Sequence, residues 1–258
     1  MGIVNLTDDS YFTQSRCAGV DAALSRIGKM VAEGVDLVDI GACSSRPGSV
    51  AVGAEEEWRR LSPVLKAVRK EFPDLSMSID TYWSDVVARA YDLIGDFVVN
   101  DISAGEDDPR MLGTVGRLGL TYIAMHKRGT SQTMQSLTDY NDVVGDVVAY
   151  FDEFSKKALQ FEIKNWILDP GFGFAKTLPQ NYELLSRLEE LKALERPVLV
   201  GVSRKSMIYK LLDISPEEAL AATQVVHLEA LKKGADMLRV HDVAEALRTV
   251  SLYRMMLP

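Results

Sequence analysis

Four side chains that can recognise a planar heterocycle lie at or just after the ends of predicted strands. They are Asp80, Asn100, Asp169 and Lys205. Carboxylates accept hydrogen bonds from amino groups and ring N–H, an amide both donates and accepts, and a lysine donates to a ring carbonyl or nitrogen. Either aspartate alone could equally cap the helix or turn that follows it. Taken together, the four side chains favour a binding site.

A second group of side chains supplies positive charge and polar contacts. Its members are Asn5, Ser45, Arg46, Arg239 and His241. They follow the first, second and eighth predicted strands, which become neighbours if the chain closes into a barrel. A phosphate or diphosphate is the natural ligand of such a group. For either arginine alone, a structural ion pair with one of the many acids is the slightly favoured interpretation.

Eight short apolar runs alternate with helical patterns and predict a parallel barrel. The runs are 2–4, 35–40, 76–79, 97–99, 121–125, 166–168, 197–202 and 237–240. The clearest helix has Trp58, Leu61 and Leu65 on one face. Another is expected to begin at Ser215, with Glu218 completing a capping box, and to end near Gly234. We therefore predict one α/β domain, a single (β/α)8 TIM barrel over residues 1–258, with its active site at the carboxyl ends of the strands.

Composition limits the partners that this chain is expected to bind. It has 29 Lys+Arg against 37 Asp+Glu among 258 residues, which argues against nucleic acid and anionic membranes. Its apolar runs fall short of a membrane span, which needs roughly 20 residues. Two cysteines and three histidines give neither a disulfide framework nor a four-ligand soft-metal pattern. We expect a cytoplasmic protein.

Several remaining residues could be mistaken for functional ones. The segment DPGFGFAKT, residues 169–177, lacks the glycine spacing of a phosphate loop or a dinucleotide fingerprint. His126 follows a strand and could be catalytic, although no Ser–His–Asp or Cys–His order accompanies it. His227, within a helix, is expected to be structural. For Cys43, inert packing is favoured over reactivity.

The motifs, taken in order, resemble dihydropteroate synthase over essentially the full chain. They are MGIVNLT, DIG…SRPG, SIDT, VND, MH…RGT, DPGFGFAKT, VGVSRKS and RVHD. The last three are the specific ones. The resemblance implies a TIM barrel that joins 4-aminobenzoate to 6-hydroxymethyl-7,8-dihydropterin diphosphate in folate synthesis and releases diphosphate. It also implies Mg²⁺, a homodimer, and competition between sulfonamides and the aminobenzoate.

The same resemblance implies a role for each matching residue. The pterin would be held by Asp80, Asn100, Met125, Asp169 and Lys205. The diphosphate would be held by Asn5, Ser45, Arg46, Arg239 and His241, with the Mg²⁺ near Asn5. The aminobenzoate site would be shaped by Pro47, Phe174, Arg204 and Ser206.

The first two motifs depart from the family pattern. Where the family usually has NVTPDSFSDGG, this chain has Asp8 for the proline, Tyr11 for the phenylalanine, Phe12 for the serine and Thr13 for the second aspartate. Thr13 removes a carboxylate, and from this change we expect lower activity or an altered sulfonamide response. Two alternatives remain open. One is a pterin-binding methyltransfer domain, which would not need the SRK and RVHD set; the other is a catalytically weakened homologue that binds pterin.

Overall fold

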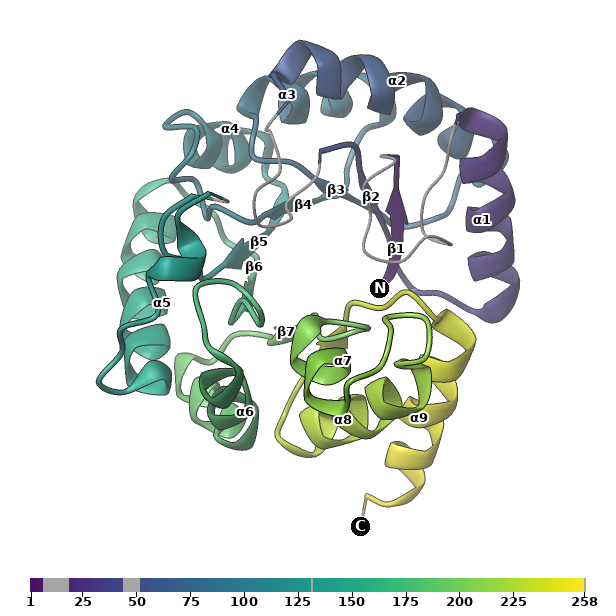
Figure 1. Ribbon diagram of the computed structural model, residues 1–258. Helices are drawn as coiled ribbons and strands as arrows, with labels where there is room; N and C mark the ends of the chain where they lie inside the picture. Colours follow the sequence, from purple (N-terminus) through teal and green to yellow (C-terminus); the bar gives the residue numbers. More distant parts are fainter. Residues whose placement is uncertain (7–18, 44–51, 131, 258) are drawn as a thin grey trace.

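The barrel is assembled from short parallel strands surrounded by helices (Figure 1). The computed structural model describes residues 1–6, 19–43, 52–130 and 132–257. The strands in this part of the chain are β1 (Gly2–Asn5), β2 (Val38–Gly41), β3 (Met77–Asp80), β4 (Val98–Asp101), β5 (Thr121–Met125), β6 (Trp166–Asp169), β7 (Leu199–Val200) and β8 (Met237–Leu238).

Pairing between neighbouring strands closes the sheet into a ring. Strands β1 to β6 form one parallel sheet in chain order, and β7 pairs with β8. Single bridges between Leu168 and Val198 and between Gly2 and Val240 join the two sheets at both junctions. The eight-stranded barrel predicted from the sequence is thereby confirmed. Strands β7 and β8 are shorter than their apolar runs because only two residues of each pair regularly.

Helices follow the strands and cover the outside of the barrel (Figure 1). They are α1 (Val20–Glu33), α2 (Ala54–Glu71), α3 (Ser84–Ile94), α4 (Met111–Leu118), α5 (Val143–Gln160), α6 (Leu178–Ser186), α7 (Ser206–Leu212), α8 (Leu220–Lys232) and α9 (Val243–Met255). The 3₁₀ segments η2 (Met134–Ser136) and η3 (Leu188–Leu194) lie beside them in the described part of the chain.

The helix expected from Ser215 begins later than its sequence signals indicate. Ser215 N–H donates to Glu218 Oε2 at 2.9 Å, and Glu218 N–H donates to Ser215 Oγ at 3.4 Å. The reciprocal contacts of a capping box are therefore present, yet they close a turn, and α8 starts only at Leu220. The prediction of the box was right and that of the helix start was wrong by about one turn.

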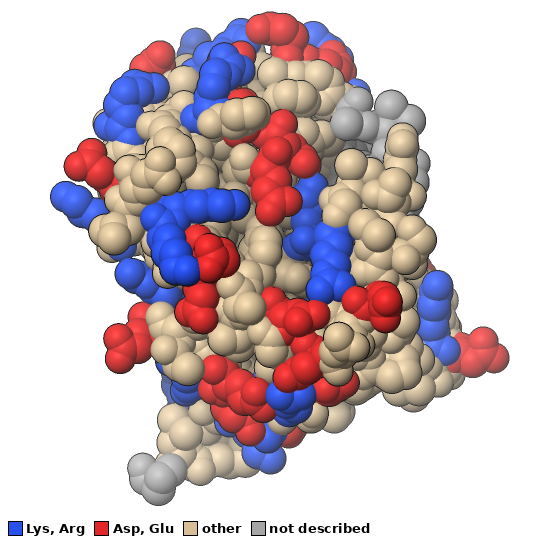
Figure 2. Space-filling model, turned by 90° about the vertical axis from the view of Figure 1, so that its left-hand side faces the viewer, with Lys and Arg blue, Asp and Glu red and all other residues tan. Residues whose placement is uncertain are grey.

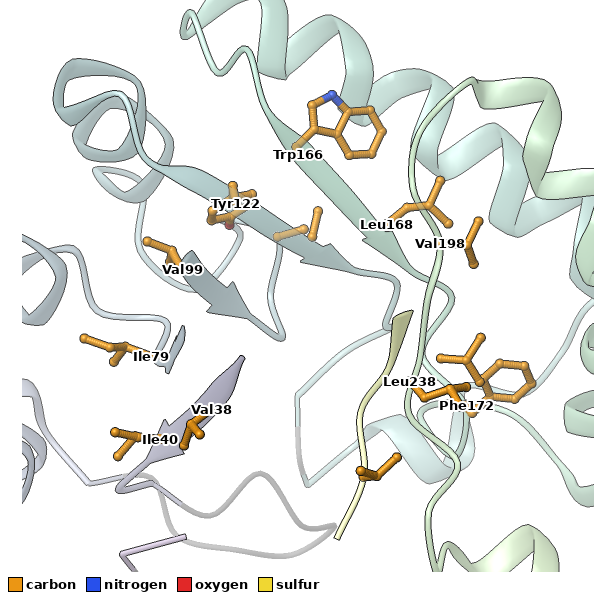
Figure 3. Close-up of a cluster of buried hydrophobic side chains, with 14 of the residues drawn as sticks. Val38, Ile40, Ile79, Val99, Tyr122, Trp166, Leu168, Phe172, Val198 and Leu238 are labelled. Carbon is orange, nitrogen blue, oxygen red and sulfur yellow. The ribbon is translucent and has the colours of Figure 1, made fainter. Parts of the chain in front are cut away.

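Side chains alternate between the outer and inner faces of the strands, and this alternation forms two separate hydrophobic cores. Outward side chains such as Ile40, Val99 and Leu168 pack against the helices in the main core, with Tyr122 and Trp166 among the aromatic members (Figure 3). A smaller apolar cluster contains Met1, Leu37, Ile123 and Leu199. These residues, and the partly buried Val98, Ile167 and Met237 beside them, have the opposite strand parity and fill the barrel interior. Nearer the carboxyl ends, residues of this inward parity become polar.

Charge on the outer surface is mixed rather than concentrated. On the side that carries α5, basic and acidic side chains lie interspersed (Figure 2). Arg187 illustrates this, since it pairs with Asp142, Glu183 and Glu190. Within the described residues, no helix has the length and apolarity needed to cross a membrane.

Candidate active site

Arg239 links two carboxylates inside the carboxyl end of the barrel. Its Nε donates to Asp39 Oδ2 at 2.7 Å, and its Nη2 donates to Asp80 Oδ2 at 2.9 Å. Asn100 Nδ2 donates to the same Asp39 oxygen at 3.1 Å. These residues come from β2, β3, β4 and the end of β8, so the barrel brings together side chains up to 200 positions apart. The ion-pair interpretation of Arg239 is confirmed, and the pair lies at the predicted site.

The electrostatics of this network keep Arg239 charged. Burial favours its neutral form, but the carboxylates of Asp39 and Asp80 outweigh that and raise its pKa. Burial raises the pKa of Asp80; the Arg239 charge opposes this, and the Asp39 charge adds to it. An anionic ligand that enters this pocket would therefore meet a cation, the Arg239 guanidinium, that is already held in position by Asp39 and Asp80.

Lys205 and Asp169 form the neighbouring part of the pocket. Lys205 Nζ donates to the carbonyl of Phe172 at 2.6 Å and lies 4.8 Å from the ring centre of Phe174. Burial lowers the pKa of Lys205 to about 8, with Asp169 opposing the shift. Asp169 Oδ1 accepts from the Gly171 N–H at 2.8 Å, so it stabilises the turn that follows β6 as the capping interpretation predicted. Burial raises the pKa of Asp169, and Lys205 opposes the shift.

His241 lies after β8 and contacts the connection that follows β7. Ser203 Oγ is 3.0 Å from His241 Nδ1 and also accepts from the His241 N–H at 3.1 Å. Burial and the charge of Arg239 lower the pKa of His241 to about 3, so the imidazole is neutral near pH 7. Arg26 Nη2 donates to the His241 carbonyl at 3.1 Å and its Nε to the Ile3 carbonyl at 3.2 Å, which ties the start of the barrel to its end.

The structure places most of the predicted residues at one end of the barrel. Met125 pairs in register with Asp169, and Asn5 ends β1 opposite Gly41, which in turn pairs with Asp80. Ser206 is the first residue of α7, directly after Lys205. Ser45, Arg46 and Pro47 lie outside the described residues, as do Asp8, Tyr11, Phe12 and Thr13.

Arg204 is positioned differently from the other predicted ligands. Its guanidinium forms a bidentate pair with Asp242, at 2.8 and 3.0 Å. It also donates to the carbonyls of Pro216 and Glu217, each at 2.7 Å. These contacts join the connections after β7 and β8. The aminobenzoate role predicted for Arg204 therefore concerns a side chain that already holds two loops together.

Sequence reasoning missed two polar residues of this region, Asp39 and Lys176. Asp39 is fully buried and contributes the oxygen shared by Arg239 and Asn100. The signal available was strand parity: Asp39 stands between the outward-facing Val38 and Ile40, so its carboxylate has to point into the barrel. Lys176 lies within the DPGFGFAKT segment, and nothing in the residue spacing of that segment indicates the buried contacts of the Lys176 side chain.

The remaining candidates have structural surroundings. His126 is 2% exposed and its Nδ1 lies 2.9 Å from Lys176 Nζ. His227 is buried within α8 and contacts Gln224, as expected for a structural histidine. Cys43 Sγ lies 3.4 Å from Tyr82 Oη, and burial raises the pKa of the thiol. A raised pKa disfavours the thiolate, which supports the interpretation of Cys43 as unreactive.

Comparison with known protein families identifies the family to which this site and fold belong. Residues 1–241 match the family model described as pterin binding enzyme. The chain belongs to this family. The dihydropteroate synthase of Synechocystis is 41% identical over 94% of this chain and 84% of its own length. That of Escherichia coli is 37% identical over 97% of this chain and 88% of its own length.

Solved structures of family members have the same fold. The dihydropteroate synthase of Yersinia pestis, solved with a sulfonamide drug, superposes with a TM-score of 0.94 at 34% identity, covering 98% of this chain and 92% of its own. That of Thermus thermophilus, solved with 4-aminobenzoate, gives a TM-score of 0.88 at 38% identity and covers 100% and 93%. The predicted fold and the resemblance to dihydropteroate synthase are both confirmed, as is the prediction of a transferase of folate synthesis.

Proposed function

We propose that the protein condenses 6-hydroxymethyl-7,8-dihydropterin diphosphate with 4-aminobenzoate to give 7,8-dihydropteroate and diphosphate. The observation that carries this is the 2.9 Å contact between Arg239 and Asp80. It joins the group suited to a heterocycle to the group suited to an anion, as a substrate with both parts requires. Related synthases have been solved with pteroic acid, with 4-aminobenzoate and with 6HMPPP.

The pterin would bind against the inward polar side chains of β3, β4 and β6. In this proposal Asp80 and Asp169 accept from the amino and ring N–H groups, Asn100 contributes its free carbonyl oxygen, and Lys205 donates to the ring carbonyl. Met125 packs beneath the ring. Burial favours a site of this kind, because hydrogen bonds to charged groups strengthen where water is excluded.

The diphosphate would bind beside Arg239 and His241, with Asn5, Ser45 and Arg46 completing its surroundings. The bond from the pterin methylene carbon to the diphosphate oxygen breaks, and the electron pair leaves with the diphosphate. The aniline nitrogen then forms the new bond to that carbon and loses one proton. An aniline is unprotonated near pH 7, so alignment of the two substrates is the main task of the protein. The permanently charged Arg239 stabilises the leaving group.

We also propose that Mg²⁺ assists, held at Asn5 together with the substrate phosphates. Among the described residues no group of three or more His, Cys, Asp or Glu side chains could hold a metal ion by itself. Asn5 would supply one amide oxygen and the substrate phosphates would supply further oxygen ligands, which suits Mg²⁺ because this ion binds oxygen ligands and is commonly held through substrate phosphates. When bound, the ion would supply charge neutralisation for the diphosphate.

Turnover by the purified protein tests the proposed reaction. The wild type is expected to form dihydropteroate in the presence of both substrates and Mg²⁺, and Lys205→Ala or Asp169→Ala is expected to abolish it. The control, Lys210→Ala, removes an exposed lysine from α7, the helix that begins directly after Lys205, and should retain the wild-type rate. Unchanged rates in the Lys205 and Asp169 variants would refute the site assignment. Tight pterin binding without diphosphate release would instead support the weakened homologue.

A homodimer packed through α8 and α9 is the oligomeric state that we propose. These helices expose large apolar side chains: Val225 is 70% exposed, Leu252 66% and Met255 85%. Equilibrium sedimentation should give twice the chain mass, and Val225→Glu should shift it towards the monomer. A monomeric wild type at micromolar concentration would contradict this. We further propose that residues 1–258 act as one catalytic domain in the cytoplasm, in keeping with two cysteines in the sequence, which are too few for a disulfide framework.

A further inference from the structure

The connection between β6 and α6 contacts Lys205 at two points and passes close to its side chain at a third. The Phe172 carbonyl accepts from Lys205 Nζ at 2.6 Å, and the Phe174 ring lies 4.8 Å from the same atom. A Cβ built on Gly173 would stand 3.6 Å from Lys205 Cδ, so the backbone there lies along the lysine stem. The position of the Lys205 ammonium therefore depends on the shape of this connection.

A second, fully internal lysine holds that connection in place. Lys176 is 4% exposed, and its Nζ donates to the carbonyls of Gly171 at 3.1 Å and Phe174 at 3.2 Å. The same Nζ lies 2.9 Å from Nδ1 of His126, which follows β5. Burial lowers the pKa of Lys176 to about 7 and that of His126 to about 2, so the His126 ring is neutral. The Lys176 amino group thus ties two carbonyls of the loop to the residue that follows β5.

Asn181 of α6 braces the opposite side of the loop. Its Oδ1 accepts from the Gly173 N–H at 2.7 Å, and its Nδ2 donates to the carbonyls of Lys176 at 3.2 Å and Thr177 at 2.7 Å. Both Ala175, with φ 49°, and Gly173, with φ 81°, have left-handed backbone angles. A loop that contains such angles needs contacts of this kind to keep a single conformation.

We propose that Lys176 is a positioning residue for Lys205: by fixing the carbonyls of Gly171 and Phe174 it sets the conformation in which the loop receives the Lys205 ammonium. Lys176 acts through the loop and does not touch the pterin. The inference rests on the proposed function, because Lys205 is the pterin ligand only in that reaction.

Binding of the pterin diphosphate, without aminobenzoate, separates positioning from stability. Lys176→Met removes all three contacts of the Lys176 amino group and is expected to raise the Kd for 6-hydroxymethyl-7,8-dihydropterin diphosphate about tenfold, which corresponds to about 1.4 kcal/mol. The matched control is Lys127→Met. Lys127 is also buried, but its ammonium pairs with Asp107 at 2.7 Å in the β4–α4 connection. That variant should lower the melting temperature and keep the wild-type Kd.

A double-mutant cycle shows whether Lys176 acts through Lys205. In a Lys205→Met background, adding Lys176→Met should change the Kd less than twofold, because the group being positioned is gone. A full tenfold effect in that background, or a wild-type Kd in Lys176→Met alone, would overturn the inference. If Lys176→Met does not fold, Lys176→Gln replaces it. Its shorter side chain keeps an N–H donor but cannot make all three contacts, so a smaller rise in Kd that disappears in the Lys205→Met background is expected, and an unchanged Kd would overturn the inference. Failure of the wild type to bind would instead remove the proposed function itself.

Discussion

The shared oxygen of Asp39 offers the sharpest test of how the site is held together. Asp39→Asn keeps the shape of the side chain and removes its charge from a fully buried position between Arg239 and Asn100. Removing one partner of a buried ion pair costs roughly 3–5 kcal/mol. Asp80 remains 2.9 Å from Arg239, so we expect the lower end, about 3 kcal/mol of unfolding free energy. For a chain of this size that is a fall in melting temperature of about 6–12 °C.

Thermal unfolding followed by circular dichroism measures this loss. Asp36→Asn is the matched control, since it removes the same charge from an exposed position three residues earlier and should stay within about 0.5 kcal/mol of the wild type. Because Arg239 loses one of its two anchors, kcat/KM should also fall for Asp39→Asn and not for the control. Melting temperatures within one degree of each other in the two variants would refute the view that Asp39 organises the network.

Three further outcomes follow from individual groups. Burial lowers the pKa of Lys205 to about 8, so the ammonium is lost as the pH rises through that value, and pterin affinity measured by fluorescence titration should weaken above about pH 8; constant affinity up to pH 10 would contradict this. Gly171→Ala should unfold the protein at lower temperature or prevent folding, because φ is 70° and the added Cβ would meet the His126 carbonyl oxygen at 2.0 Å; a wild-type melting curve would be evidence against the loop geometry. Burial raises the pKa of Cys43, so iodoacetamide at pH 7.5 should alkylate it more slowly than a free thiol peptide; an equal rate would argue against the packed interpretation.

The sequence predicted the barrel well because its apolar runs and polar clusters alternate regularly. What it predicted less well depended on distant contacts. The Ser215–Glu218 box is a local signal, and it formed; whether a helix follows at once depends on Arg204, which binds the carbonyls of Pro216 and Glu217 and holds that segment as a turn. Local propensity contains no information about such a contact.

The residues of the site likewise fall into those that local sequence signals indicate and those that only the folded chain reveals. The positions of Asp80, Asn100 and Asp169 were predictable because each lies at the end of a strand or one residue before it, where the geometry of a parallel barrel directs side chains into one cleft. Asp39 stands within its strand, and Lys176 lies beyond one, so both were missed although each is buried among polar groups. Arg239 was predicted to belong to the anion group, and its contacts with Asp39 and Asp80 became visible only in the folded chain.

The stoichiometry of product formation shows whether the protein condenses the pterin diphosphate with 4-aminobenzoate. Purified protein is mixed with the pterin diphosphate, 4-aminobenzoate and Mg²⁺, and diphosphate and dihydropteroate are measured together over time. We expect the two products to form in equal amounts, and we expect omission of the aminobenzoate to abolish dihydropteroate formation. A protein that binds the pterin diphosphate tightly while releasing neither product would contradict it.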